Sequence, residues 1–173
     1  SATSINLLEV LLRDRYQVAD FTAEVRGASI EDLAAQQHPA LLIGDRALKL
    51  AAAAPAGMQI YDLGELWYEH TGLPFVFALW MIRREALQCH RPALEALGEQ
   101  LLASRCVVLG QPQAYAEAAA RTIGLTPAQI VAYWNTIDYR LDPLHLQGLQ
   151  LFFERCHAHG LLADVPPINF LSA

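Results

Sequence analysis

The sequence predicts an α/β fold with a parallel sheet in its first half, followed by a second half built only of helices. Up to about residue 84, short apolar or β-branched runs alternate with helical patterns, which is typical of parallel strands joined by crossover helices. Beyond that point every pattern is helical and is separated from the next by proline or glycine. These helices are expected to pack on a sheet, but the sequence predicts too few strands to form one of sufficient size. We therefore expect an additional N-terminal segment, not included in this chain, to carry the rest of the sheet.

Three strands and four helices are predicted in the first half. Hydroxyl residues precede the first helical pattern and are candidate caps. Ser29 with Asp32 resembles a capping box at the start of the second helix. Glycine or proline ends several of the predicted elements. The predicted helices cover residues 7–16, 29–37, 45–54 and 62–71, and the predicted strands cover residues 18–25, 40–44 and 75–83.

The second half is predicted to hold four helices. Thr126-Pro127 and Asp142-Pro143 each place a capping residue before a proline at the first helical position. The four predicted helices cover residues 91–105, 112–124, 126–141 and 142–160.

Composition excludes several classes of function. The net charge is -6 and the only lysine is Lys49, so no nucleic-acid-binding face is expected. The longest uncharged apolar run, Leu73 to Ile82, has 10 residues, whereas a membrane-spanning helix needs ~20, so no membrane partner is expected. Three cysteines without a CxxC motif are interpreted as free thiols in a reducing compartment, which favours the cytoplasm.

Two polar stretches could face a ligand. Ser1, Thr3 and Ser4 stand at a helix start, where unpaired backbone N–H groups and hydroxyls can bind a carboxylate or phosphate. Plain helix capping explains the same residues. Gly44 and Asp45 follow the predicted strand at 40–44, and in parallel sheets the carboxyl ends of strands line the ligand crevice. Asp45 would serve equally well as an ordinary capping aspartate.

A third candidate is the rigid turn Gly72-Leu73-Pro74, which leads from a helix into an apolar run. Its glycine allows close backbone approach and its proline fixes the entry to the predicted strand. This turn suits a crossover between two lobes beside a ligand, or a simple connecting loop. The motif "CHAHG" at residues 156–160 has metal-like spacing but no partner set elsewhere, so no metal site is predicted.

Taken together, three motifs resemble the chorismate dehydratases of menaquinone biosynthesis by the futalosine route. The motifs are "LLIGDRAL" from Leu41, "YDLGELWYEHTGLPFVFALW" from Tyr61 and "GLQLFF" from Gly148, in this order. The similarity spans essentially the whole chain, from Ser1 to about Phe170.

The resemblance implies a two-lobed fold like that of type II periplasmic solute-binding proteins, with a ligand cleft between the lobes. The N-terminal part of the first lobe would then be absent from this chain. Residues 1–74 would form the second α/β lobe. Residues 75–173 would form the return hinge strand and the C-terminal helices that complete the first lobe. With half of the cleft wall missing, we do not expect the 173-residue chain to be active alone.

The resemblance also implies a lyase that removes water from chorismate to give 3-[(1-carboxyvinyl)oxy]benzoate, without a cofactor or metal. Chorismate carries two carboxylates, and Thr3 and Ser4 would donate hydrogen bonds to one of them. Ser1 would be a polar contact near the reacting centre, and Asp45 would orient the leaving hydroxyl. The remaining residues expected to contact the substrate are Gly44, Gly72, Leu73 and Pro74.

Two alternatives stay open. The sister enzyme of the pathway, 1,4-dihydroxy-6-naphthoate synthase, is expected to have a catalytic histidine where this chain has Gly44-Asp45. No histidine falls between His38 and His70, which disfavours it. A non-catalytic solute-binding protein would share the fold and bind a small carboxylate. The sequence leaves the oligomeric state open, with a dimer as one option.

Overall fold

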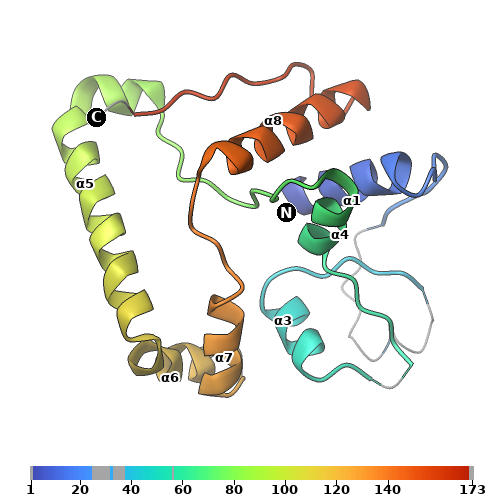
Figure 1. Cartoon of the computed structure of the whole chain (residues 1–173), viewed down its shortest axis with the longest axis horizontal. Helices are drawn as coiled ribbons and strands as arrows, with labels where there is room; N and C mark the ends of the chain where they lie inside the picture. Colours follow the sequence, from blue (N-terminus) through green and yellow to red (C-terminus); the bar gives the residue numbers. More distant parts are fainter. Residues whose placement is uncertain (1, 25–31, 33–37, 56, 172–173) are drawn as a thin grey trace. The chain divides into compact units, whose positions relative to one another are not determined.

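The computed structural model describes residues 2–24, 32, 38–55 and 57–171, and its regular elements there are helices (Figure 1). The helices are α1 Ala2–Asp14, α3 Asp45–Ala52, α4 Leu63–Thr71, α5 Arg84–Gly110, α6 Pro112–Ile123, α7 Pro127–Trp134 and α8 Pro143–Ala158. The helix predicted at 29–37 lies outside the described residues, apart from Asp32. In the part of the chain that the structure describes, no helix is long and apolar enough to cross a membrane.

Capping residues mark the starts of three helices. Asp62 caps α4 by accepting a hydrogen bond from the Glu65 N–H at 3.0 Å, and Gly72 ends that helix with φ of 71°, a conformation that favours glycine. Thr126 begins α7 with a complete capping box. Asp142 caps α8, where the hydrogen bond from the His145 side chain lowers the pKa of its carboxyl group. The cap-proline predictions at α7 and α8 are confirmed.

The predicted helix at 91–105 is part of a longer and kinked element. Helix α5 runs from Arg84 to Gly110 and breaks at His90, whose φ of -133° is not helical. Pro92 lies two residues further on, and its ring and missing N–H are incompatible with an uninterrupted helix across this point.

The three predicted strands are not present as strands among the described residues. Residues 18–24, 40–43 and 75–83 are non-helical chain without a strand assignment. The expectation of a buried strand fails most clearly at Trp80 and Met81, which are 84% and 89% exposed. A short apolar run predicts an extended backbone, but a strand also needs a neighbour to accept its hydrogen bonds, and a run of residues cannot supply that neighbour. The α/β class and the two-lobed fold therefore remain predictions.

The chain divides into two compact units. One unit contains Ser1–Phe77 and Arg140–Pro167, and the other contains Ala78–Tyr139 and Ile168–Ala173. In the first unit, α1 packs against both α4 and α8, although these helices are far apart in the sequence. The division into lobes at residue 74 is a separate expectation and stays a prediction.

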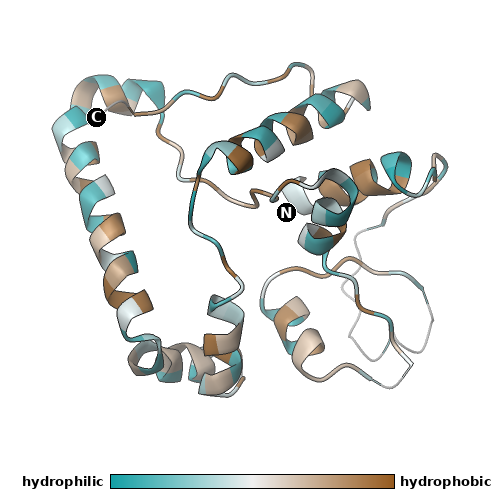
Figure 2. Ribbon diagram, viewed as in Figure 1, coloured by the Kyte–Doolittle hydropathy of each residue, from teal (hydrophilic) through white to brown (hydrophobic). Residues whose placement is uncertain are grey.

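The core of the first unit lies where α1, α4 and α8 meet. Its buried members are Leu7, Val10, Leu11, Trp67, Phe152 and Cys156. Phe75 joins them with edge-to-face contacts to Trp67 and Phe152, at ring-centroid distances of 5.5 Å and 4.9 Å. Figure 2 shows hydrophobic and hydrophilic residues interleaved along α1 and α8, as expected for helices with one buried face. Each fully buried large side chain stabilises the unit by about 1.5–3 kcal/mol.

The second unit is built from α5, α6 and α7. Helix α6 packs against α7 and α5, and its buried residues are Ala116 and Ala120. Ile130 of α7 is fully buried, and the Arg105 guanidinium of α5 donates a hydrogen bond to the Tyr139 carbonyl at 3.3 Å. Small alanines at the buried positions allow the helices to approach closely.

Candidate substrate-binding site

The first turn of α1 carries two of the predicted substrate-binding residues. Thr3 is half-buried, and Ser4 is 8% exposed. The first N–H groups of a helix have no partner within the helix, so this end can donate several hydrogen bonds to an anion. Ser1, predicted to lie near the reacting centre, is outside the described residues.

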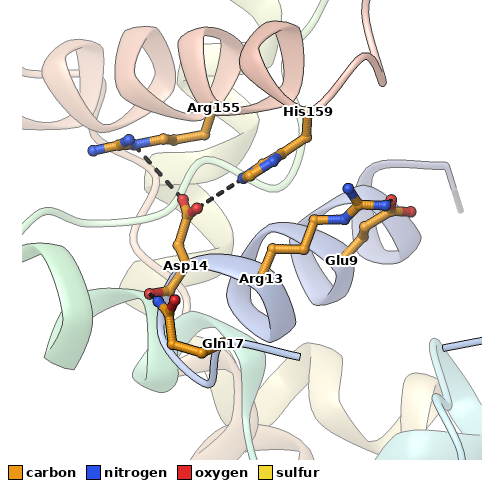
Figure 3. Close-up of polar contacts among 6 residues, drawn as sticks. All are labelled: Glu9, Arg13, Asp14, Gln17, Arg155 and His159. Carbon is orange, nitrogen blue, oxygen red and sulfur yellow. Dashed lines mark hydrogen bonds and ion pairs between the residues drawn. The ribbon is translucent and has the colours of Figure 1, made fainter. Parts of the chain in front are cut away.

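Helix α1 is anchored at its other end by polar contacts of two residues, Asp14 and Arg15. Arg15 donates hydrogen bonds to the Leu66 carbonyl at 2.9 Å and to the Glu69 carboxylate at 2.7 Å, both in α4. Asp14 approaches α8, where His159 Nε2 lies 2.7 Å from Asp14 Oδ1 and Arg155 Nε lies 3.7 Å from Asp14 Oδ2 (Figure 3). Two neighbouring helices thus hold the C-terminal end of α1.

The turn Gly72-Leu73-Pro74 directly follows α4. The Thr71 hydroxyl donates a hydrogen bond to the Trp67 carbonyl at 2.8 Å and accepts one from the Leu73 N–H at 3.1 Å. The Thr71 side chain therefore hydrogen-bonds both to a backbone carbonyl of α4 and to a backbone N–H of the turn. Gly72 is exposed, while Leu73 and Pro74 are half-buried.

Gly44 and Asp45 lie at the start of α3. Gly44 is the N-terminal flanking residue of this helix, with φ of 66°, and Asp45 is its first residue. Both are exposed, and α3 contributes no buried residue. The described residues therefore place Thr3, Ser4 and the 72–74 turn on or beside the packed helices α1 and α4, without bringing Asp45 into that group.

The cysteine and histidine motif at residues 156–160 lies at the C-terminal end of α8. Among the described residues, no group of three histidine, cysteine, aspartate or glutamate side chains is arranged to hold a metal ion. Burial raises the pKa of the Cys156 thiol from 9.0 to about 11, with a smaller contribution from the Glu9 charge. The thiol therefore stays protonated near neutral pH and does not offer a reactive thiolate.

Sequence reasoning missed the contact between Asp14 and His159. These residues are 145 positions apart, and the motif that contains His159 has only metal-like spacing as a sequence signal. No local pattern connects them. The only available signal was that Asp14 and His159 stand at the ends of two amphipathic helical patterns, which by itself does not predict that the helices meet.

Two comparisons with known proteins bear on the site. A protein-family model described as menaquinone biosynthesis matches residues 1–158. The chain is 36% identical over 168 residues to a chorismate dehydratase of Thermus thermophilus. That alignment covers 89% of this chain and 59% of the relative, so the chain spans somewhat more than half of the relative's length.

Proposed function

The chain belongs to the menaquinone biosynthesis family, and on that premise we propose that it serves a chorismate dehydratase activity. The observation that carries the proposal is the 36% identity to a protein of that name over most of this chain. The reaction would be an elimination in which the ring 4-hydroxyl of chorismate leaves with the proton at C3. Aromatisation of the ring would drive it, giving 3-[(1-carboxyvinyl)oxy]benzoate and water.

The N-terminal turn of α1 supports the proposal chemically. Chorismate is a dianion, and a site that binds it must replace the water around its carboxylates with fixed donors. Thr3 and Ser4 offer hydroxyl donors beside the unpaired N–H groups of the helix end. Ser4 lies on the packed side of α1 and is 8% exposed, so its hydroxyl is largely shielded from bulk water.

The other site residues keep the roles that the family resemblance implies. Asp45 is proposed to orient the leaving hydroxyl, and Ser1 to contact the substrate near the reacting centre. Gly44 and the 72–74 turn are proposed to line the site, with glycine backbones allowing close approach. The two-lobed fold and a cytoplasmic location belong to the same proposal.

The proposal is tested by adding chorismate to the purified full-length protein and following the aromatic product by absorbance and mass. We expect a product lighter than chorismate by one water molecule, with the mass of the enolpyruvyl benzoate. Saturable binding of chorismate without turnover would instead support a solute-binding protein. The absence of both turnover and binding would contradict the proposed activity.

Replacing either hydroxyl of the α1 turn is expected to lower kcat/KM. A hydrogen bond to a charged group contributes about 1.5–3 kcal/mol, so Thr3→Ala and Ser4→Ala should each cost about 10- to 100-fold. Ile5→Ala is the matched control, because Ile5 is in the same turn, is 45% exposed and has no side-chain donor. Steady-state kinetics with chorismate measure the effect. An equal loss in all three variants would show that the hydroxyls have no specific role.

A further inference from the structure

We propose that Asp14 and His159 are positioning residues that fix where the N-terminal turn of α1 lies. The inference rests on the proposed function, because it concerns the same Thr3 and Ser4 donors. It begins from the 2.7 Å contact between Asp14 Oδ1 and His159 Nε2, which joins the last residue of α1 to the end of α8 (Figure 3). An ionised carboxylate only accepts hydrogen bonds, so the imidazole donates through Nε2.

The contact is sheltered from solvent. The side chains of His159 and Asp14 are 21% and 16% exposed, and Arg155 adds a positive charge on the other carboxylate oxygen. The remaining charged groups drawn around it, Glu9 and Arg13, pair with each other at 2.7 Å along α1. Because water is partly excluded here, this contact is electrostatically stronger than an ion pair on the exposed surface.

Apolar packing alone does not fix the axial position of α1. Leu7, Val10 and Leu11 bury one face of the helix, but the hydrophobic effect has no direction and tolerates small slides and rotations. The polar contacts at the C-terminal end are directional and therefore select one register. Arg15 fixes the helix to α4, and Asp14 fixes it to α8.

A shift at Asp14 is transmitted to the other end of the helix. Residues 2–14 contain neither glycine nor proline, so α1 has no natural point at which to bend. Thr3 lies 11 residues from Asp14, about 17 Å along the axis, and moves with it as one rigid body. A misplacement of 1 Å in a binding group can cost up to about 100-fold in rate.

The test compares three variants of the full-length protein in steady-state kinetics with chorismate. Asp14→Leu removes the carboxylate at similar size and should raise KM about fivefold. Asp14→Asn keeps an acceptor for His159 and should stay within about twofold of the unaltered protein. Glu9→Gln removes an ion pair of the same 2.7 Å length that lies wholly within α1, and it should also stay within about twofold. A KM unchanged by Asp14→Leu, with only a lower Tm, would show a merely structural contact and overturn the inference.

Amide hydrogen exchange of residues 6–12 gives a second readout that does not need activity. We expect exchange in this part of α1 to be about tenfold faster in Asp14→Leu than in Glu9→Gln, because the helix is less firmly held. Equal exchange in the two variants would overturn the inference. If the unaltered protein does not turn over chorismate, the proposed function fails, and exchange alone decides whether Asp14 holds the helix.

Discussion

Replacement of Trp67 by alanine is expected to lower the free energy of unfolding by about 3–5 kcal/mol. Trp67 is fully buried at the centre of the first unit, in edge-to-face contact with Phe75 and Phe152. Removing the indole leaves a cavity where α1, α4 and α8 meet, and these helices can close it only in part. Urea denaturation followed by circular dichroism measures the loss.

Trp80→Ala is the matched control for this prediction. Trp80 is 84% exposed, so the same change of side chain should alter the free energy of unfolding by no more than about 0.5 kcal/mol. If Trp67→Ala does not fold, Trp67→Phe keeps an aromatic ring at the site and should show a smaller loss. Equal effects of the substitutions at Trp67 and Trp80 would contradict the core described above.

Replacement of Gly148 by alanine is expected to lower the free energy of unfolding by about 3 kcal/mol. A Cβ atom at Gly148 would overlap the Pro74 carbonyl oxygen and would lie 3.5 Å from Leu73 Cβ. The obstacle is mostly backbone, which cannot rotate away as a flexible side chain could. Either α8 or the turn after α4 must therefore move, and thermal and urea unfolding would report the cost.

The same substitution at Gly98 is expected to have the opposite effect on the free energy of unfolding. Gly98 is inside α5, and an added Cβ there would meet no atom within 4 Å. Alanine is the better helix former by about 1 kcal/mol, so this variant should be more stable than the unaltered protein. If Gly148→Ala lowers the free energy of unfolding and Gly98→Ala raises it, the effect of close packing is separated from that of helix propensity. A loss of similar size at both positions would argue against the contact between Gly148 and Pro74.

Helices were predictable because their signals are local. The proline after Thr126 and after Asp142 marks a helix start within a few residues, and the structure has α7 and α8 beginning there. Strands were not predictable in this way, because an apolar run such as residues 75–83 favours an extended backbone but does not specify a neighbouring strand to pair with. The same limit applies to the kink at His90, which depends on how Pro92 fits into a helix that continues on both sides.

The candidate site was predictable only in part. The hydroxyls of the α1 turn stand out because they precede a strong helical pattern, and the structure has Thr3 and Ser4 in the first turn of that helix. The contact proposed to hold them in place joins Asp14 to His159, which are 145 positions apart. Chemistry of this kind follows from tertiary packing, which a single sequence does not reveal.

The packing of α1 also bears on how the chain acquires its structure during synthesis. Leu7, Val10 and Leu11 are synthesised before Phe152 and Cys156, which cover them and follow all of α5, α6 and α7 in the chain. Closing so long a loop makes this core a late and slow step of folding. Until α8 appears, the apolar side of α1 lacks part of its cover, and transiently exposed apolar surface of this kind favours aggregation.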